Sequence, residues 1–350
     1  RAAPGGAVAF DGLVTASGDL PGGAVNDLAV PLEGTWSQGR GLALGTRCTL
    51  LRFASLTLSG LALKGQQVTL CPQGNAPILA YRDGLTLAAR TGPLNLAGSL
   101  GESPATLSAT GAVLRYPQPF AIEGLAATIG SGDSEIRLSA ANLTGNLVGT
   151  PSGTFVGGAA RLAVVPLDLD AITGRWSFAD GALRIEDGAF TLTDRPAQGA
   201  VRFAPLAANG ASLTLIDNRI TANAALAHPA SGRAVVQVAI THNLGTATGS
   251  ARLSVPGLVF DRGLQPDELT PLAKGVIALA TGTITGDGRI DWTADTITSS
   301  GTIRSDNFDL AAAFGPVRGL SGKVVFTDLL NLTTAPDQTL SIAAINPGIE

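Results

Sequence analysis

The sequence is poor in charged residues, histidine and aromatic residues, and these shortages exclude several classes of function. Charged side chains make up 14% of the 350 residues, against roughly 25% in a typical soluble domain. His228 and His242 are the only histidines, and neither lies near a cysteine or at ligand spacing from a carboxylate cluster in the sequence. Most Ser-His and metal-His mechanisms are therefore excluded. We predict neither an enzyme nor a site for a metal or cofactor.

Clusters of positive charge and long apolar runs are also missing. The formal net charge is −4 and no Lys/Arg cluster occurs, so the sequence lacks the basic patch that binds nucleic acid phosphates. The longest apolar candidate, "KGVIALATGTITG" at 274–286, is shorter than the roughly 18 residues of a membrane helix and is rich in Thr and Gly. Even so, hydrophobic residues make up 45% of the chain. The protein therefore has much apolar surface that must be buried or covered.

Methionine is absent, and the first residues show neither the charged nor the apolar region of a signal peptide. The last residues, "INPGIE", stand where another strand could begin. We therefore expect a segment of a longer protein, with its targeting information outside this sequence.

The two cysteines, Cys48 and Cys71, are too few for a zinc site. The stretch between them contains a glycine turn that could bring the chain back on itself. Two buried free thiols are one possibility. We favour a disulfide between them, which indicates an oxidising compartment.

Apolar and polar residues alternate along most of the chain, which predicts strands with one apolar face. In "SGKVVFTDLLNLTT", at 321–334, one strand is expected to put five apolar residues on one side: Leu320, Val324, Phe326, Leu330 and Leu332. In "GRWSFADGALRIEDGAFTL", at 174–192, Asp-Gly pairs at 180–181 and 187–188 separate alternating runs and predict two hairpins.

Helical patterns occur in only two places. "PDELTPLAKGVIALA", at 266–280, has apolar residues at helical spacing, although Pro271 is expected to break it early. "DLAAAFG", at 309–315, predicts one or two helical turns. Acidic stretches at 168–170 ("DLD") and 286–291 ("GDGRID") lack the full calcium-loop pattern and are interpreted as aspartates at turns.

The predicted fold class is all-β, with roughly thirty strands at 8–12 residues per strand. A single flat sheet rarely exceeds about ten strands. The alternation therefore fits a long curled sheet, a stack of sandwiches or a parallel β-helix. Ordinary core packing is the simplest use of the apolar faces. An elongated repetitive sheet, however, has few layers to bury them, and then becomes an apolar groove suited to an acyl chain.

The C-terminal third carries a resemblance to a known family. "TGTITGDGRIDW", followed by "GTIRSDNFDLAAAFGPVRGLSGKVVFTDLLNLTTAPDQTLSIAAINPGIE", resembles the C-terminal region of YdbH-like proteins, in the AsmA-like group of bacterial envelope proteins. The resemblance covers roughly residues 250 to 350. The earlier residues share the general sequence pattern of the family more than recognisable motifs.

The resemblance implies an elongated, curled, repeating β-groove of many short, mainly antiparallel strands, with one or two short helices. The implied role is carrying phospholipids between the inner and outer membranes of a Gram-negative bacterium, through the periplasm. The implied partners are phospholipids, an outer-membrane lipoprotein that adds a β-strand near the C-terminal end, and the inner membrane through an anchor outside this segment. We expect residues 1–165 and 166–350 to form two continuous groove segments.

The residues predicted to line the groove are collective apolar contacts rather than a catalytic set. They are Trp176, Phe178, Leu183, Ile185, Phe190, Leu192, Leu253, Val255, Ile284, Ile290, Trp292, Ile297, Ile303, Val324 and Phe326. The helix at 266–280 is a candidate cap or plug. The alternative function is a structural or adhesive β-solenoid of the cell surface with a dry packed core.

Overall fold

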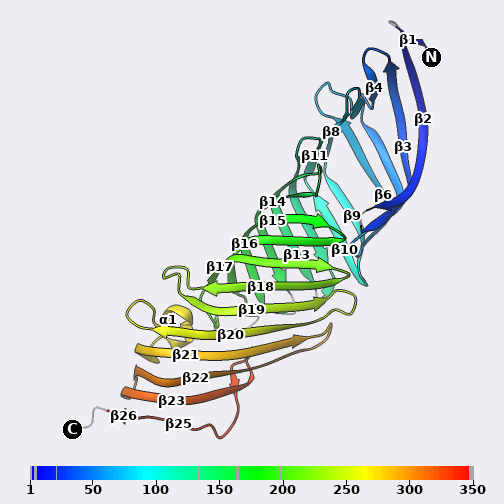
Figure 1. Ribbon diagram of the computed structural model, residues 1–350. Coiled ribbons are helices and arrows are strands. Elements are labelled where there is room, and N and C mark those ends of the chain that lie inside the picture. The colour runs from blue at the N-terminus through cyan, green and yellow to red at the C-terminus, as the bar shows by residue number, and fades with distance from the viewer. Residues whose placement is uncertain are drawn as a thin grey trace. The chain divides into compact units, whose positions relative to one another are not determined.

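A computed structural model describes residues 2–3, 6–20, 22–132, 135–162, 165–196 and 199–346. Strands hold 72% of the chain and helices 2%, which confirms the all-β prediction. The strands belong to one sheet with 26 strands among the described residues. The pairings that the structure describes are antiparallel and mostly join strands that are close in sequence, as Figure 1 shows. This pattern differs from that of a parallel β-helix.

The first half of the strand series runs to residue 162. Its members are β1 (Ala2–Ala3), β2 (Ala7–Leu20), β3 (Gly23–Ser37), β4 (Gly41–Leu44), β5 (Thr49–Leu58), β6 (Leu61–Pro72), β7 (Leu79–Tyr81), β8 (Leu85–Thr91), β9 (Leu94–Leu100), β10 (Ser103–Ala109), β11 (Gly111–Tyr116), β12 (Phe120–Ile129), β13 (Ile136–Asn146) and β14 (Ser152–Leu162).

The second half of the strand series includes the helical turns α1 and η2. Its members are β15 (Leu167–Ala179), β16 (Ala182–Asp194), β17 (Leu206–Ile216), β18 (Arg219–Ala227), β19 (Ala234–Asn243), β20 (Thr248–Phe260), α1 (Pro266–Leu269), the 3₁₀ turn η2 (Pro271–Ala273), β21 (Ile277–Trp292), β22 (Ile297–Ala312), β23 (Gly315–Asp328), β24 (Thr333–Thr334), β25 (Leu340–Ser341) and β26 (Ala344–Ile345).

The chain divides into two compact units, each described here by itself. The first comprises residues 1–160, 172–186 and 214–218. The second comprises residues 161–171, 187–213 and 219–350. Segments of β15, β16 and β17 belong partly to one unit and partly to the other.

The first unit is a meander of strands that are interrupted near their middle. β3 pairs with β4 at one end and with β5 at the other, and β6 pairs with β8 and β9 in the same divided way. Cys48 stands before β5 and Cys71 at the end of β6, and the structure joins them by a disulfide. The bond links the start of β5 to the end of β6, and these two strands pair with each other.

A residue in the left-handed region of φ changes the alternation inside several strands. Asp27 in β3 has φ of 50°, and the β2–β3 register shifts between Ala16 and Gly18 at this point. Ala16 pairs with Leu28 whereas Gly18 pairs with Val25. The left-handed residue therefore moves the apolar face from odd to even positions without ending the strand.

Asp187 repeats this conformation, and the hairpin predicted at Asp187-Gly188 is wrong. Asp187 has φ of 51° but lies inside β16, which continues from Ala182 to Asp194. The hairpin at Asp180-Gly181 is present, with both residues at positive φ between β15 and β16. An Asp-Gly pair therefore serves as a turn at one site and as a bulge seven residues later, and the local sequence is similar at both.

The predicted helix at 266–280 is much shorter than expected. α1 ends at Leu269, η2 covers three residues, and residues 277–280 begin β21. Thr270 is extended, with φ of −143° and ψ of 123°, because the residue before a proline is disfavoured in the helical region. Pro271 thus ends the helix, as its position predicts.

Three other sequence interpretations are also wrong. Residues 309–312 continue β22 and residue 315 starts β23, so "DLAAAFG" forms a strand and a hairpin turn rather than a helix. "DLD" and "GDGRID" lie inside β15 and β21, not at turns. β23 ends at Asp328, so the expected strand at 321–334 stops before Leu330 and Leu332.

Candidate functional site

The second unit places its apolar residues on one face of β18–β23, which we call the inner face. Directly opposed residues in an antiparallel pair lie on the same side of a sheet. Ala251 opposes Ile290, and Ile290 opposes Ser299. Gly249 opposes Trp292, which in turn opposes Ile297. The pairings therefore connect these residues into rows that cross several strands.

The rows of the inner face hold apolar residues and glycine almost throughout. In order across the strands, four of these rows are Ile220–His242–Gly249–Trp292–Ile297, Ala222–Ile240–Ala251–Ile290–Ser299, Ala224–Val238–Leu253–Gly288–Gly301–Phe326 and Val255–Gly286–Ile303–Val324.

Glycines on this face make room for large side chains on neighbouring strands. A Cβ on Gly249 would overlap the ring of Trp292, and a Cβ on Gly282 would lie 2.9 Å from the ring of Phe308. A glycine inside a strand often marks such a close approach, and here it lets a large side chain lie across the neighbouring strand.

The opposite, outer face of the same strands is polar. Arg252 opposes Arg289, and Arg304 opposes Lys323. Arg289 also forms an ion pair with Asp291 at 2.6 Å, and the hydrogen bond from the guanidinium lowers the pKa of the Asp291 carboxyl. The inner face of the rows named above carries no such charge, so the two faces differ sharply in polarity.

The inner face is covered at one end of the strands by residues 261–273, which we call the cover segment. Its Leu264 and Leu269 are buried in a cluster with Leu258, Phe260 and Phe308. Leu264 is fully buried, and the rings of Phe260 and Phe308 meet edge to face at 5.7 Å. At this end the inner face is an ordinary packed core.

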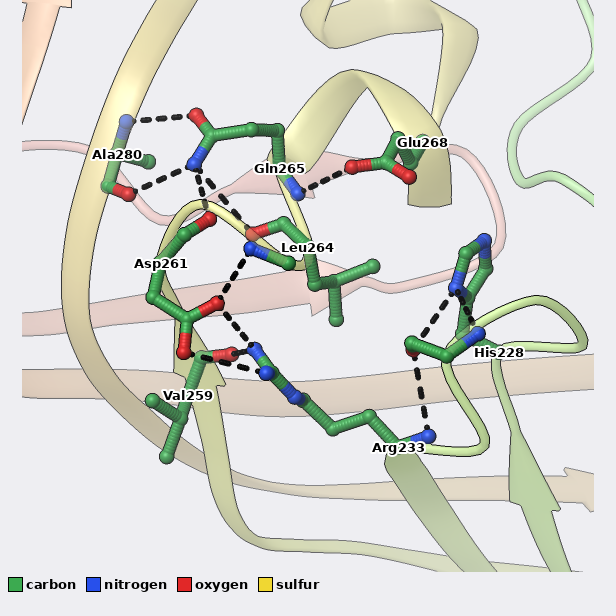
Figure 2. A network of polar contacts seen from close by, with 10 residues as sticks. His228, Arg233, Val259, Asp261, Leu264, Gln265, Glu268 and Ala280 are labelled. Carbon is green, nitrogen blue, oxygen red and sulfur yellow. Dashed lines mark hydrogen bonds and ion pairs between the residues drawn. The ribbon is translucent and has the colours of Figure 1, made fainter.

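Polar contacts fasten the cover segment to the neighbouring strands (Figure 2). The Gln265 side chain donates to the carbonyl of Ala280 at 3.0 Å and accepts from the Ala280 N–H at 2.8 Å. Arg233 donates to both carboxylate oxygens of Asp261, at 3.0 and 3.1 Å, and its hydrogen bonds lower the pKa of that carboxyl. The side-chain amide of Gln265 thus forms the two hydrogen bonds with the Ala280 backbone that a neighbouring strand would otherwise form.

Arg202 connects the cover segment to a second segment of the unit. Its backbone carbonyl accepts a hydrogen bond from the Thr270 hydroxyl. Its guanidinium donates to the Leu330 carbonyl at 3.1 Å and to Asp194, whose side chain has no exposed surface. Burial alone raises the pKa of Asp194, but the hydrogen bonds and charge of Arg202 outweigh it, and the pKa lies below its ordinary value.

Residues 328–331, which we call the terminal turn, cross the inner face after β23 ends. The Ser299 hydroxyl donates to Asp328 at 2.7 Å, and the backbone N–H groups of Leu330 and Asn331 donate to the same carboxylate oxygen at 3.0 and 3.1 Å. These hydrogen bonds, that from Ser299 first, lower the pKa of the Asp328 carboxyl. An aspartate that accepts from its following backbone ends the strand.

The nine predicted lining residues from Leu253 onward all lie on the inner face, on the register of β20–β23. Val255 and Ile284 pack against the covered core. Ile290 is buried, whereas Ile303 keeps 37% of its surface exposed. Phe190 and Leu192, from β16, also pack against the covered core. Their role as lining for a lipid stays a prediction.

The remaining four predicted residues belong to the first unit. The ring of Trp176 lies 6.1 Å from that of Phe120 and over Gly145, and its Nε1–H donates to the Thr144 carbonyl. Ile185 faces Gly174. Phe178 lies beside Gly22, and Leu183 is half-buried in β16. Trp176 over Gly145 repeats the arrangement of Trp292 over Gly249 in the second unit.

The histidines have structural surroundings. His228 is buried in the loop after β18, where its Nδ1 lies 3.0 Å from the Ser231 hydroxyl. His242 lies on the inner face and its Nδ1 accepts from Trp292 Nε1–H at 3.2 Å. Burial lowers the pKa of His242. Among the described residues, no group of three or more His, Cys, Asp or Glu is placed to hold a metal ion.

A family model described as "Intermembrane phospholipid transport protein YdbH" matches residues 2–350. The chain belongs to the YdbH-like family. The resemblance noted over roughly the last hundred residues therefore extends to the whole chain. Membership implies phospholipid transport between membranes, and with it a periplasmic, Gram-negative setting. Neither the curated proteins nor the solved structures contain a match.

The helices that the structure describes are too short and too polar to span a bilayer.

Sequence reasoning missed the residues that close part of the inner face. Asp194 and Arg202 are eight positions apart with no motif around them, and the single strand expected at 321–334 left no place for a turn at 328–331. The available signal was the Asp328-x-x-Asn331 pattern, which is typical of a turn.

Proposed function

We propose that this YdbH-like chain is a periplasmic bridge segment that conducts phospholipids between the inner and outer membranes along its apolar inner face. The observation that carries the proposal is the separation of polarity in β18–β23. One face holds Leu, Ile, Val, aromatic residues and glycine, and the other holds Arg, Lys, Asp and Thr. A sheet face that is only partly covered, as at Ile303, offers apolar surface to an acyl chain.

The physical advantage of such a face is a lower barrier to moving a lipid. Removing an acyl chain from a bilayer into water costs about 0.8 kcal/mol per CH₂, so a sixteen-carbon chain faces a barrier on the order of 12 kcal/mol. Apolar contact at every position along the strands reduces this cost without any reacting group. The proposal therefore assigns no catalytic residue.

The proposal includes two partners besides phospholipid. The inner membrane is reached through an anchor outside this segment. An outer-membrane lipoprotein adds a β-strand near the C-terminal end, at the edge of β23. Among the described residues, that edge is paired by three two-residue strands, β24, β25 and β26, and by single hydrogen bonds from Ala335, Gln338, Ala343 and Asn346. A longer added strand would replace this short, interrupted pairing.

A crosslinking experiment tests the lipid path. A photo-crosslinking residue is placed singly at Trp292, Ile303 and Arg304 of the intact protein in cells grown with radiolabelled phosphate. We expect labelled phospholipid on Trp292 and Ile303, and not on Arg304, which lies on the outer face. Equal labelling at all three positions would show nonspecific adhesion. No labelling at any position would support a packed structural core and contradict the proposal.

A further inference from the structure

One row of the inner face contains a gap that the other rows described lack. Leu253, Gly288, Gly301 and Phe326 oppose one another in order across four strands. Strands lie about 4.8 Å apart, so the backbones of Leu253 and Phe326 are about 14 Å apart. The two adjacent glycines between them contribute no side chain. The row therefore forms a slot with a backbone floor and a large apolar side chain at each end.

The side chain of Leu329 fills this slot. A Cβ on Gly288 would lie 3.0 Å from Leu329 Cδ2, and a Cβ on Gly301 would lie 3.4 Å from the same atom. Leu329 does not belong to the sheet, because β23 ends at Asp328 and the terminal turn carries the residue back over the inner face. The occupant of the slot thus comes from a turn, not from a strand.

The contacts that hold Leu329 in place lie outside the slot. Ser299 and two backbone N–H groups bind the Asp328 carboxylate, and Arg202 binds the Leu330 carbonyl. Inside the slot, a Cβ on Gly288 would lie 3.0 Å from Leu329 Cδ2 and 3.2 Å from Leu253 Cδ1, so both leucine side chains lie over this glycine. A methylene chain presents the same aliphatic surface as a leucine side chain and forms equivalent contacts there.

We propose that the Leu253–Gly288–Gly301–Phe326 row is an acyl-chain subsite and that Leu329 is an internal occupant that the acyl chain displaces. The inference rests on the proposed function, because it names where on the inner face the lipid chain is held. It also accounts for the second glycine of "GDG" in "TGDGRI". Gly286 and Gly288 lie on the inner face of β21, and Asp287, which opposes Ser254 and Thr302, lies on the outer face.

Two substitutions change the slot in opposite directions. Leu329→Ala empties it and leaves the polar contacts of the terminal turn. Gly288→Val fills it. Gly288 suits this change because the three atoms nearest to a Cβ there belong to the side chains of Leu329 and Leu253, at 3.0 to 3.3 Å. Gly286 is unsuitable, since a Cβ there would lie 2.6 Å from the Thr302 carbonyl oxygen.

The test uses a photo-crosslinking aromatic residue in place of Phe326, with the same residue at Ile303 as a reference, in the intact protein in cells with radiolabelled phospholipid. We expect Leu329→Ala to raise lipid labelling at Phe326 by at least about threefold and Gly288→Val to lower it by at least about threefold. Labelling at Ile303 provides the normalisation in each variant.

Thr302→Val is the matched control for Gly288→Val. The control also places a valine next to this row, but in β22 and on the outer face, since Thr302 opposes Asp287 and Val325. We expect no change in labelling at Phe326. Thermal unfolding of each variant shows whether it folds. If Gly288→Val fails to fold, Gly288→Ala replaces it, because its side chain is smaller. We then expect a smaller decrease in lipid labelling at Phe326.

The outcomes separate the subsite from the proposed function. If lipid labels Ile303, and neither Leu329→Ala nor Gly288→Val changes the labelling at Phe326, the subsite is overturned and the lipid path is left intact. An equal loss at Phe326 in Thr302→Val would also overturn it. Absence of lipid at both probe positions would overturn the proposed function, and the subsite with it.

Discussion

Removing the guanidinium of Arg202 should destabilise the second unit strongly. Arg202 is the partner of a carboxylate, Asp194, that has no exposed side-chain surface, and the Arg202 side chain itself is only 18% exposed. Breaking a buried pair by removing one partner costs roughly 3–5 kcal/mol, because the remaining charge is left buried. The Arg202 backbone N–H still donates to Asp194, so we expect Arg202→Met to cost about 3 kcal/mol, the low end of that range.

The assay is thermal unfolding followed by circular dichroism. For a cooperative unit of roughly 150–250 residues, each kcal/mol lowers Tm by about 2–4 °C, so Arg202→Met should lower it by about 6–12 °C. Replacing both members of the pair with apolar residues, in Asp194→Leu/Arg202→Met, should recover part of this loss, because no buried charge remains.

The effect also has a defined dependence on pH. The pKa of Asp194 is lowered in the native protein, so its contribution is present above the unfolded value of about 3.9 and is lost as pH falls through the folded pKa. In Arg202→Met, burial without the guanidinium should raise the pKa of Asp194, so the carboxyl loses its buried charge only when pH falls below that raised pKa. The difference in Tm should therefore be full near pH 7 and should narrow below about pH 5. A decrease in Tm under about 2 °C at pH 7, or a double variant no more stable than the single one, would refute the reasoning.

Three further predictions concern other parts of the chain. Cys48→Ser should lower the free energy of unfolding by about 3 kcal/mol, from the closure of a loop with a separation of 23 residues, and dithiothreitol should have the same effect on the native protein but none on the variant. Burial lowers the pKa of His242, so the free energy of unfolding, measured from pH 7.5 to 5, should fall as pH drops below about 6.5. His242→Phe should remove the part of this pH dependence that the histidine causes. Gln265→Leu leaves the backbone groups of Ala280 without the side-chain partner that they have now and should cost about 1–3 kcal/mol; unchanged hydrogen exchange of the Ala280 amide would contradict the proposed role of this contact.

Particular elements show where the sequence pattern was sufficient. The alternation in 282–304 predicts strands whose inner residues are Ile284, Ile290, Trp292, Ile297 and Ile303, and the register of β21 and β22 puts all five on one face. An alternating pattern has a period of two, so it assigns faces correctly as long as the strand stays regular. Pro271 likewise ended the helix as its chemistry predicts.

The pattern failed where a single residue changed the backbone region. Asp187 takes a left-handed conformation inside β16, and Asp-Gly has a similar local preference for a turn and for a bulge. Residues 309–315 have the composition of a helix, but their pairing with β21 and β23 outweighs that weak preference.

Alternation along the chain is enough to predict a series of strands with one apolar and one polar face, because it is a local property that pairing of neighbouring strands preserves. Which part of the apolar face is closed depends on contacts that form only in the folded chain. Leu264 and Leu329 reach that face from turns, and Leu269 reaches it from the short helix α1. Hydrogen bonds of Gln265, Arg202 and Asp328 hold these segments in place and join residues up to 128 positions apart. Such long-range contacts depend on where the strands place the turns in space, and no local pattern records that.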